Sequence, residues 1–154
     1  MDINYKEESI AQHQKNVATF IHLSTFLRFA MPFGNFIDPI ILWISNKDKS
    51  EFVDAHGKQA INFQISILLY TVIFWVLSIP VFVLISLNAI NPHGFFDFYL
   101  SKNLPSSFIS SGLITAVGLL LFKFVFEVAF IVLASLKARD GQPYKYPLTI
   151  NFIK

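Results

Sequence analysis

An uninterrupted apolar stretch between residues 62 and 87 dominates the hydropathy pattern of the chain. It contains no charged residue, no histidine and no glycine, and its apolar residues would cover every face of a helix. A helix rises about 1.5 Å per residue, so a stretch of this length crosses a hydrocarbon layer roughly 30 Å thick. The pattern therefore predicts a membrane-spanning helix over 60–87, kinked at Pro80.

Three further segments have the apolar composition of membrane segments. One runs over 108–136 and is long enough to cross a bilayer. The other two, 17–31 and 36–45, are short and are separated by a turn with proline and glycine at 32–35. They either cross a locally thinned bilayer as two short helices or form a hairpin that enters and returns. We therefore predict an all-α integral membrane helical bundle with about four membrane segments in a single domain, 1–154.

The polar segments that flank these helices are predicted to lie at the membrane surface. Residues 1–16 predict a surface helix. Residues 45–61 predict an amphipathic helix that starts after Ser50 and bends at Gly57 into the long span. Residues 137–154 alternate apolar and polar positions near their end, which predicts an extended tail against the membrane surface or against the 45–61 helix.

Basic residues are distributed unevenly between these segments. Nine of the twelve lysines and arginines lie in 1–16, 45–61 and 137–154, whereas the aromatic loop at 88–109 has only Lys102. The positive-inside rule places the basic segments in the cytoplasm and the loop outside, where its aromatic run would lie at the interface. The acidic, polar N-terminal residues are unlike a cleavable signal peptide. We predict a multi-pass protein of a bacterial inner membrane with both termini cytoplasmic.

The composition narrows the chemistry that the chain could support. Of its 154 residues, 54% are hydrophobic and 14% charged, against roughly 25% charged in soluble domains. The net charge of +2 and the lack of a basic run argue against nucleic acid as a partner. There is no cysteine, no catalytic or phosphate-binding motif and no histidine spacing typical of a metal site. We predict a non-enzymatic protein without cofactor or metal, whose partners are membrane lipid and other membrane proteins; a homo-oligomer is left open.

Four ionisable residues lie within or beside the predicted membrane segments, where charge is costly and often functional. Lys123 and Glu127 are four residues apart and share a helix face, either as a structural ion pair or as part of a polar path. Arg28 and Asp38 flank the turn at 32–35 and could pair with each other. These two pairs are the candidate intramembrane polar pairs.

Four sequence motifs resemble those of a known family. They are 22–25, 38–43, 52–64 and 141–147. They are similar to small bacterial membrane proteins of the Tic-twenty-like group, named for an inner-envelope subunit of the chloroplast protein-import translocon. The resemblance implies a non-enzymatic subunit or accessory factor of a larger membrane complex, with protein translocation as the process it suggests. The alternative is a small oligomeric transporter or channel, because interrupted helices and intramembrane charges recur at transport sites.

The resemblance also points to the polar signature at 52–64, with the tail, as the place where a partner would bind. The candidate partner surface consists of Asp54, His56, Lys58, Asn62, Gln64, Tyr144 and Tyr146.

Overall fold

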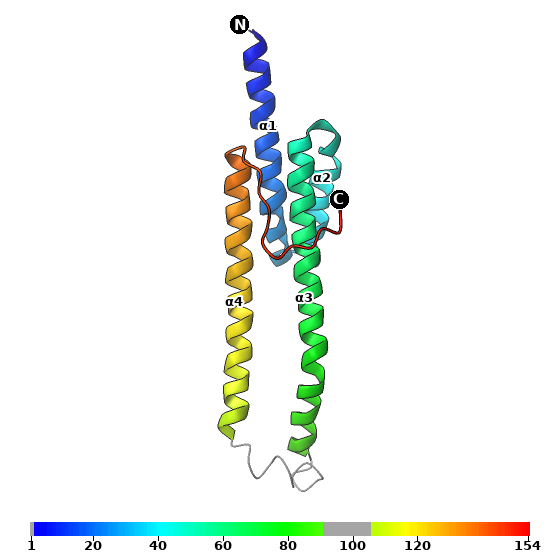
Figure 1. Ribbon diagram of the computed structural model, residues 1–154, viewed down its shortest axis with the longest axis vertical. Coiled ribbons are helices and arrows are strands. Elements are labelled where there is room, and N and C mark those ends of the chain that lie inside the picture. The colour runs from blue at the N-terminus through cyan, green and yellow to red at the C-terminus, as the bar shows by residue number, and fades with distance from the viewer. Residues whose placement is uncertain (1, 91–105) are drawn as a thin grey trace. The chain divides into compact units, whose positions relative to one another are not determined.

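The computed structural model describes residues 2–90 and 106–154, and every regular element in them is helical. The α-helices are α1 (Asp2–Ser24), α2 (Gly34–Ile44), α3 (Glu51–Ile90) and α4 (Ser106–Arg139), and the short 3-10 helices are η1 (Thr25–Phe29) and η2 (Lys47–Lys49) (Figure 1). The all-α class is thus confirmed for the described residues. The aromatic run predicted to lie at the interface falls outside them.

The chain divides into two compact units. Unit 1 combines Met1–Leu68 with Glu127–Lys154, and unit 2 is Leu69–Phe126. The described part of unit 2 consists of stretches of α3 and α4 whose large apolar side chains are mostly exposed; Leu77 is 69% exposed and Phe122 is 68% exposed. So large an apolar surface is unfavourable in contact with water, which indicates that lipid or another apolar partner covers it.

Two helices among the described residues are long and apolar enough to span a membrane, Glu51–Pro80 and Ile114–Arg139. They correspond to the two long predicted spans. The short predicted segments give no such helix: α2 has 11 residues and rises only about 16 Å, roughly half of a hydrocarbon core. The structure therefore contains two candidate spanning helices, where the sequence suggested about four membrane segments.

The two short segments form a hairpin within unit 1, in which α1 and η1 pack against α2. The turn between them ends at Phe33, whose φ is 60°, and α2 begins at Gly34. A Cβ atom at Gly34 would lie 2.5 Å from the carbonyl oxygen of Leu27, so only glycine allows the chain to approach this closely. The predicted break at the proline and glycine is therefore a tight helix–helix turn.

The bend predicted at Gly57 is absent, because α3 runs as one helix from Glu51 to Ile90. Gly57 instead leaves room for the indole ring of Trp43, which would overlap a Cβ atom at that position. The indole is fixed by a hydrogen bond of 2.8 Å from its Nε1 to Oδ1 of Asp54. Gly57 therefore serves close packing of α2 against α3.

Candidate functional site

The C-terminal tail has no regular secondary structure. It lies along α3 and is held there by side chains of that helix. The amide of Asn62 donates from Nδ2 to the carbonyl of Ile153 at 2.9 Å. Its Oδ1 accepts from the backbone N–H groups of Phe152 at 3.1 Å and Ile153 at 2.9 Å. The hydroxyl of Ser66 accepts from the N–H of Ile150 at 2.9 Å. An extended segment needs such partners, because it forms no ladder or helix of its own.

A chain of three buried side chains connects α1, α3 and the tail. Nε2 of His22 lies 2.9 Å from Nδ1 of His56, and the hydroxyl of Tyr146 lies 3.0 Å from Nδ1 of His22. The three residues are 0%, 1% and 2% exposed, respectively. Tyr146 also stacks on Phe63, with ring centroids 4.1 Å apart. The polar chain therefore lies inside the packed core of unit 1.

Burial keeps two members of this chain, His22 and Tyr146, uncharged. His22 lies on α1, outside the two candidate spanning helices; burial, and then the charge of His56, lower its pKa from 6.5 to about 3. Burial is also the main reason that the pKa of Tyr146 is raised well above 10, with Tyr144 and Glu127 adding to the effect. Both groups are neutral at physiological pH, as groups removed from water prefer to be.

A second polar cluster connects the hairpin to both long helices. Nη2 of Arg28 lies 2.5 Å from Oε1 of Glu127 on α4; this is an ion pair by distance, although its angles are not those of a hydrogen bond. The same Nη2 donates to Oε1 of Gln64 on α3 at 2.6 Å, and Nδ2 of Asn35 donates to that oxygen at 2.9 Å. Glu127 is 3% exposed, and Arg28 provides the opposite charge that a buried carboxylate needs nearby.

This cluster corrects both candidate intramembrane pairs. Glu127 pairs with Arg28, not with Lys123, which forms no ion pair among the described residues. Asp38 does not pair with Arg28, and its Oδ2 is buried without a hydrogen-bond partner in the described part of the chain. Lys123 and Glu127 are indeed four residues apart on α4, but Arg28 of the hairpin lies closer to the carboxylate of Glu127 than Lys123 does.

The candidate partner surface is only partly a surface. His56, Asn62, Gln64 and Tyr146 are each at most 2% exposed and serve the internal contacts described above. The other three members are half-buried: Asp54, Lys58 and Tyr144. Lys58 Nζ pairs with Asp54 Oδ2 at 2.6 Å, one turn apart on α3. Most of the polar signature therefore holds unit 1 together.

An open groove nevertheless lies in this region of unit 1, with a volume of about 690 Å³. Side chains from the first turns of α3 line it on one side, and the tail lines it on the other. His56, Lys58, Asn62 and Tyr144 from the candidate surface take part in the lining, together with Lys145. Partner binding at these residues stays a prediction. His22, Asn35 and Gln59 were not among the candidate residues, because their contacts join positions far apart in the chain.

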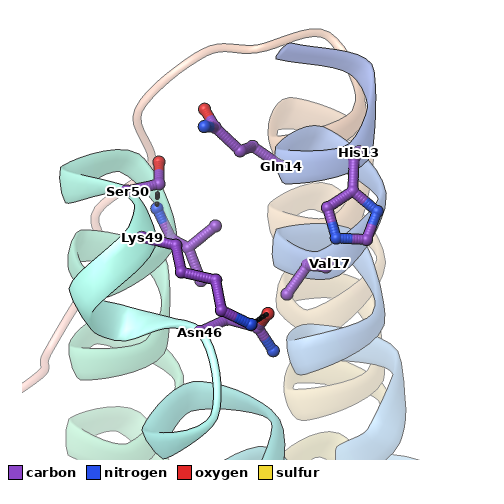
Figure 2. Close-up of a pocket in the computed structure, with 7 residues that line it drawn as sticks. His13, Gln14, Val17, Asn46, Lys49 and Ser50 are labelled. Atoms are coloured by element: carbon purple, nitrogen blue, oxygen red, sulfur yellow. Dashed lines mark hydrogen bonds between the residues drawn. The ribbon is translucent and has the colours of Figure 1, made fainter. Parts of the chain in front are cut away.

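A smaller cavity of about 330 Å³ opens between α1 and the start of α3, and Figure 2 shows its lining. Lys49 Nζ donates to Oδ1 of Asn46 at 3.2 Å, and the Ser50 hydroxyl accepts from the N–H of Val53 at 3.4 Å. The predicted helix start after Ser50 is thus confirmed, with its side chain in the capping position. The cavity also contains His13, but no group of three or more metal ligands occurs among the described residues.

Taken together, the fold and these contacts define a helical protein with two candidate membrane-spanning helices and with buried, mutually bonded polar side chains in unit 1. The model of the magnetosome magnetite crystal formation protein family matches residues 13–153. The chain belongs to this family. No curated protein and no solved structure matches it.

The family match overturns the resemblance to the Tic-twenty-like group. Every run on which that resemblance rested lies inside residues 13–153 and is accounted for by the magnetosome family. Protein translocation is therefore not a function that this sequence supports. Similar helical layouts occur in proteins of unrelated function, so the layout does not identify a process.

Proposed function

We propose that the chain is a non-enzymatic integral membrane protein that takes part in magnetite crystal formation as a member of a membrane assembly. The observation that carries the proposal is the family match over residues 13–153, combined with the exposed apolar surface of unit 2. Non-enzymatic action is supported by the partners of two buried ionisable side chains: the carboxylate of Glu127 pairs with Arg28, and the imidazole of His22 is bonded at both nitrogens.

In this proposal, α3 and α4 cross the membrane and the hairpin enters it and returns on the same side. Two findings support the hairpin: α2 is too short to cross, and residues on its outer side, such as Ile41 (57% exposed), are apolar. At its turn, Phe29 and Phe33 are 65% and 71% exposed. Both termini then lie in the cytoplasm, as the distribution of basic residues predicts.

The alternative of a small transporter or channel receives less support. An ion path through a bundle uses charged groups that are accessible to water and can change partners. Arg28 and Glu127 instead hold each other and Gln64, which favours a structural role. Lys123 is the remaining candidate for such a path, and it lies half-buried in unit 2.

The test is complementation in a magnetite-forming bacterium from which its own member of this family has been deleted. We expect the intact chain to restore the size distribution and number of crystals seen by electron microscopy. The matched pair of variants is Leu77→Arg, which places a charge on the exposed apolar surface of unit 2, and Lys137→Ala, which alters an exposed residue elsewhere. Leu77→Arg should abolish membrane recovery and rescue together, whereas Lys137→Ala should preserve both. Full membrane insertion without any effect on crystals would refute the proposed role.

A further inference from the structure

The groove between α3 and the tail presents unpaired positive charge. Three lysines line it, Lys58 from the helix and Lys145 and Lys154 from the tail, and none of the described residues in its lining is acidic. Lys58 is already paired with Asp54. Lys145, in contrast, is exposed and forms no ion pair within the described residues. An anion in the groove would therefore meet a lysine whose charge is not offset by a protein carboxylate.

A buried hydrogen-bonding group without a partner lies in the same lining. His56 is 1% exposed, and its Nε2 has no hydrogen bond among the described residues. The main chain of Gln142 lies near the ring, but not in the geometry of a hydrogen bond. Buried polar atoms are nearly always paired in folded proteins, so an exception at the edge of a cavity points to a group that is bound there.

The neighbouring hydrogen bonds determine whether this nitrogen donates or accepts. The hydroxyl of Tyr146 is buried, and its hydrogen is satisfied if it donates to Nδ1 of His22. His22 then carries its own hydrogen on Nε2 and donates it to Nδ1 of His56. The neutral ring of His56 must in turn carry its hydrogen on Nε2. The reverse direction would leave the hydroxyl hydrogen of Tyr146 unpaired in the core, which is costly.

The groove therefore combines a fixed N–H donor with a free ammonium group, and both require an oxygen acceptor with negative charge. We propose that it binds a phosphate group, held by Nε2–H of His56 and by the ammonium group of Lys145. The groove lies over the first turns of α3, which is also one of the two candidate spanning helices. Phospholipid headgroups stand at this level of a membrane. A headgroup and free inorganic phosphate present the same chemistry to the site.

The experiment uses the full chain in nanodiscs, with the imidazole nitrogens labelled with 15N. In one arm the discs contain only digalactosyldiacylglycerol, a lipid without phosphate, and inorganic phosphate is added, with chloride at equal ionic strength as the control. In the other arm the discs contain phosphatidic acid, and no free phosphate is present. We expect the Nε2–H signal of His56 to shift and saturate in at least one arm. The arm that responds identifies the source as free phosphate or as the lipid headgroup.

The variants separate a specific site from general attraction between charges. Lys145→Ala should weaken binding about threefold to tenfold, the usual range for one charge-assisted hydrogen bond at a partly exposed site. Lys137→Ala removes an exposed lysine outside the groove and should leave binding unchanged. Both substitutions are at exposed positions, so the fold is retained. The proposal is overturned if neither arm moves the His56 signal, if chloride moves it equally, or if the two lysine variants behave alike.

Discussion

Asn62 holds the C-terminal tail, and replacing it with alanine should release the last residues of the tail. The side chain makes three hydrogen bonds to the tail backbone, all of 2.9–3.1 Å, from a position that is 1% exposed. Each such bond contributes a net stabilisation of about 1 kcal/mol, because the freed tail groups can bond to water instead. Asn62→Ala should therefore lower the free energy of local opening of the tail by about 3 kcal/mol.

Amide hydrogen exchange in detergent micelles measures this free energy directly. A change of 3 kcal/mol corresponds to roughly a hundredfold faster exchange at Phe152 and Ile153. Ser66→Ala removes the single bond to the N–H of Ile150 and should accelerate exchange there about fivefold. Asn151→Ala is the matched control, since this exposed asparagine lies in the tail itself. Unchanged protection of Phe152 and Ile153 in Asn62→Ala would refute the claim that this residue holds the tail.

Three further predictions concern unit 1. Gly57→Ala should destabilise the protein by about 1–3 kcal/mol through overlap with the neighbouring indole, despite the better helix propensity of alanine; a higher melting temperature would contradict this. The lowered pKa of His22 means that the unfolded chain binds a proton that the folded chain does not, so stability decreases as the pH falls through 6.5. Between pH 7.5 and 5.5 this histidine should account for a loss of about 1.4 kcal/mol, and the total loss should be smaller by that amount in His22→Gln; an unchanged loss would contradict this. Arg28→Ala leaves the carboxylate of Glu127 without its partner and should cost about 2–3 kcal/mol in urea or thermal unfolding, less than for a fully buried pair because the arginine side chain is 26% exposed; restored stability in a double variant with Glu127→Gln would confirm the cause.

Hydropathy and local signals predicted much of the fold. Two long apolar stretches gave the two candidate spanning helices, because lipid selects apolar residues on every helix face. The helix start after Ser50 followed from its capping chemistry, which depends only on the next few residues. Gly57 was misread as a bend, because a glycine permits either a bend or the close approach of another side chain. Periodicity along one helix cannot tell these uses apart.

The polar interior could not be predicted in the same way. Glu127 was expected to face Lys123 on its own helix, yet it pairs with Arg28 on the hairpin. The bond between His22 and Tyr146 joins residues 124 positions apart. The packing of the helices determines which distant residues become partners, and a single sequence carries no direct signal of that packing. The same limit explains why the run at 52–64 suggested an exposed surface, although His56, Asn62 and Gln64 are buried in unit 1.

The most direct test of the central claim is the sidedness of single cysteines, since the natural chain contains none. The claim is that the chain crosses the membrane through α3 and α4, with both termini in the cytoplasm. Cysteines at Lys49 and Lys154 should react with a charged maleimide only after the cells are opened, because both positions are expected in the cytoplasm. A cysteine at Lys102 should react in intact cells. A cysteine at Leu121, within the predicted span, should not react in either case. Labelling of Lys154→Cys in intact cells, or rapid labelling of Leu121→Cys by the charged reagent, would contradict the account.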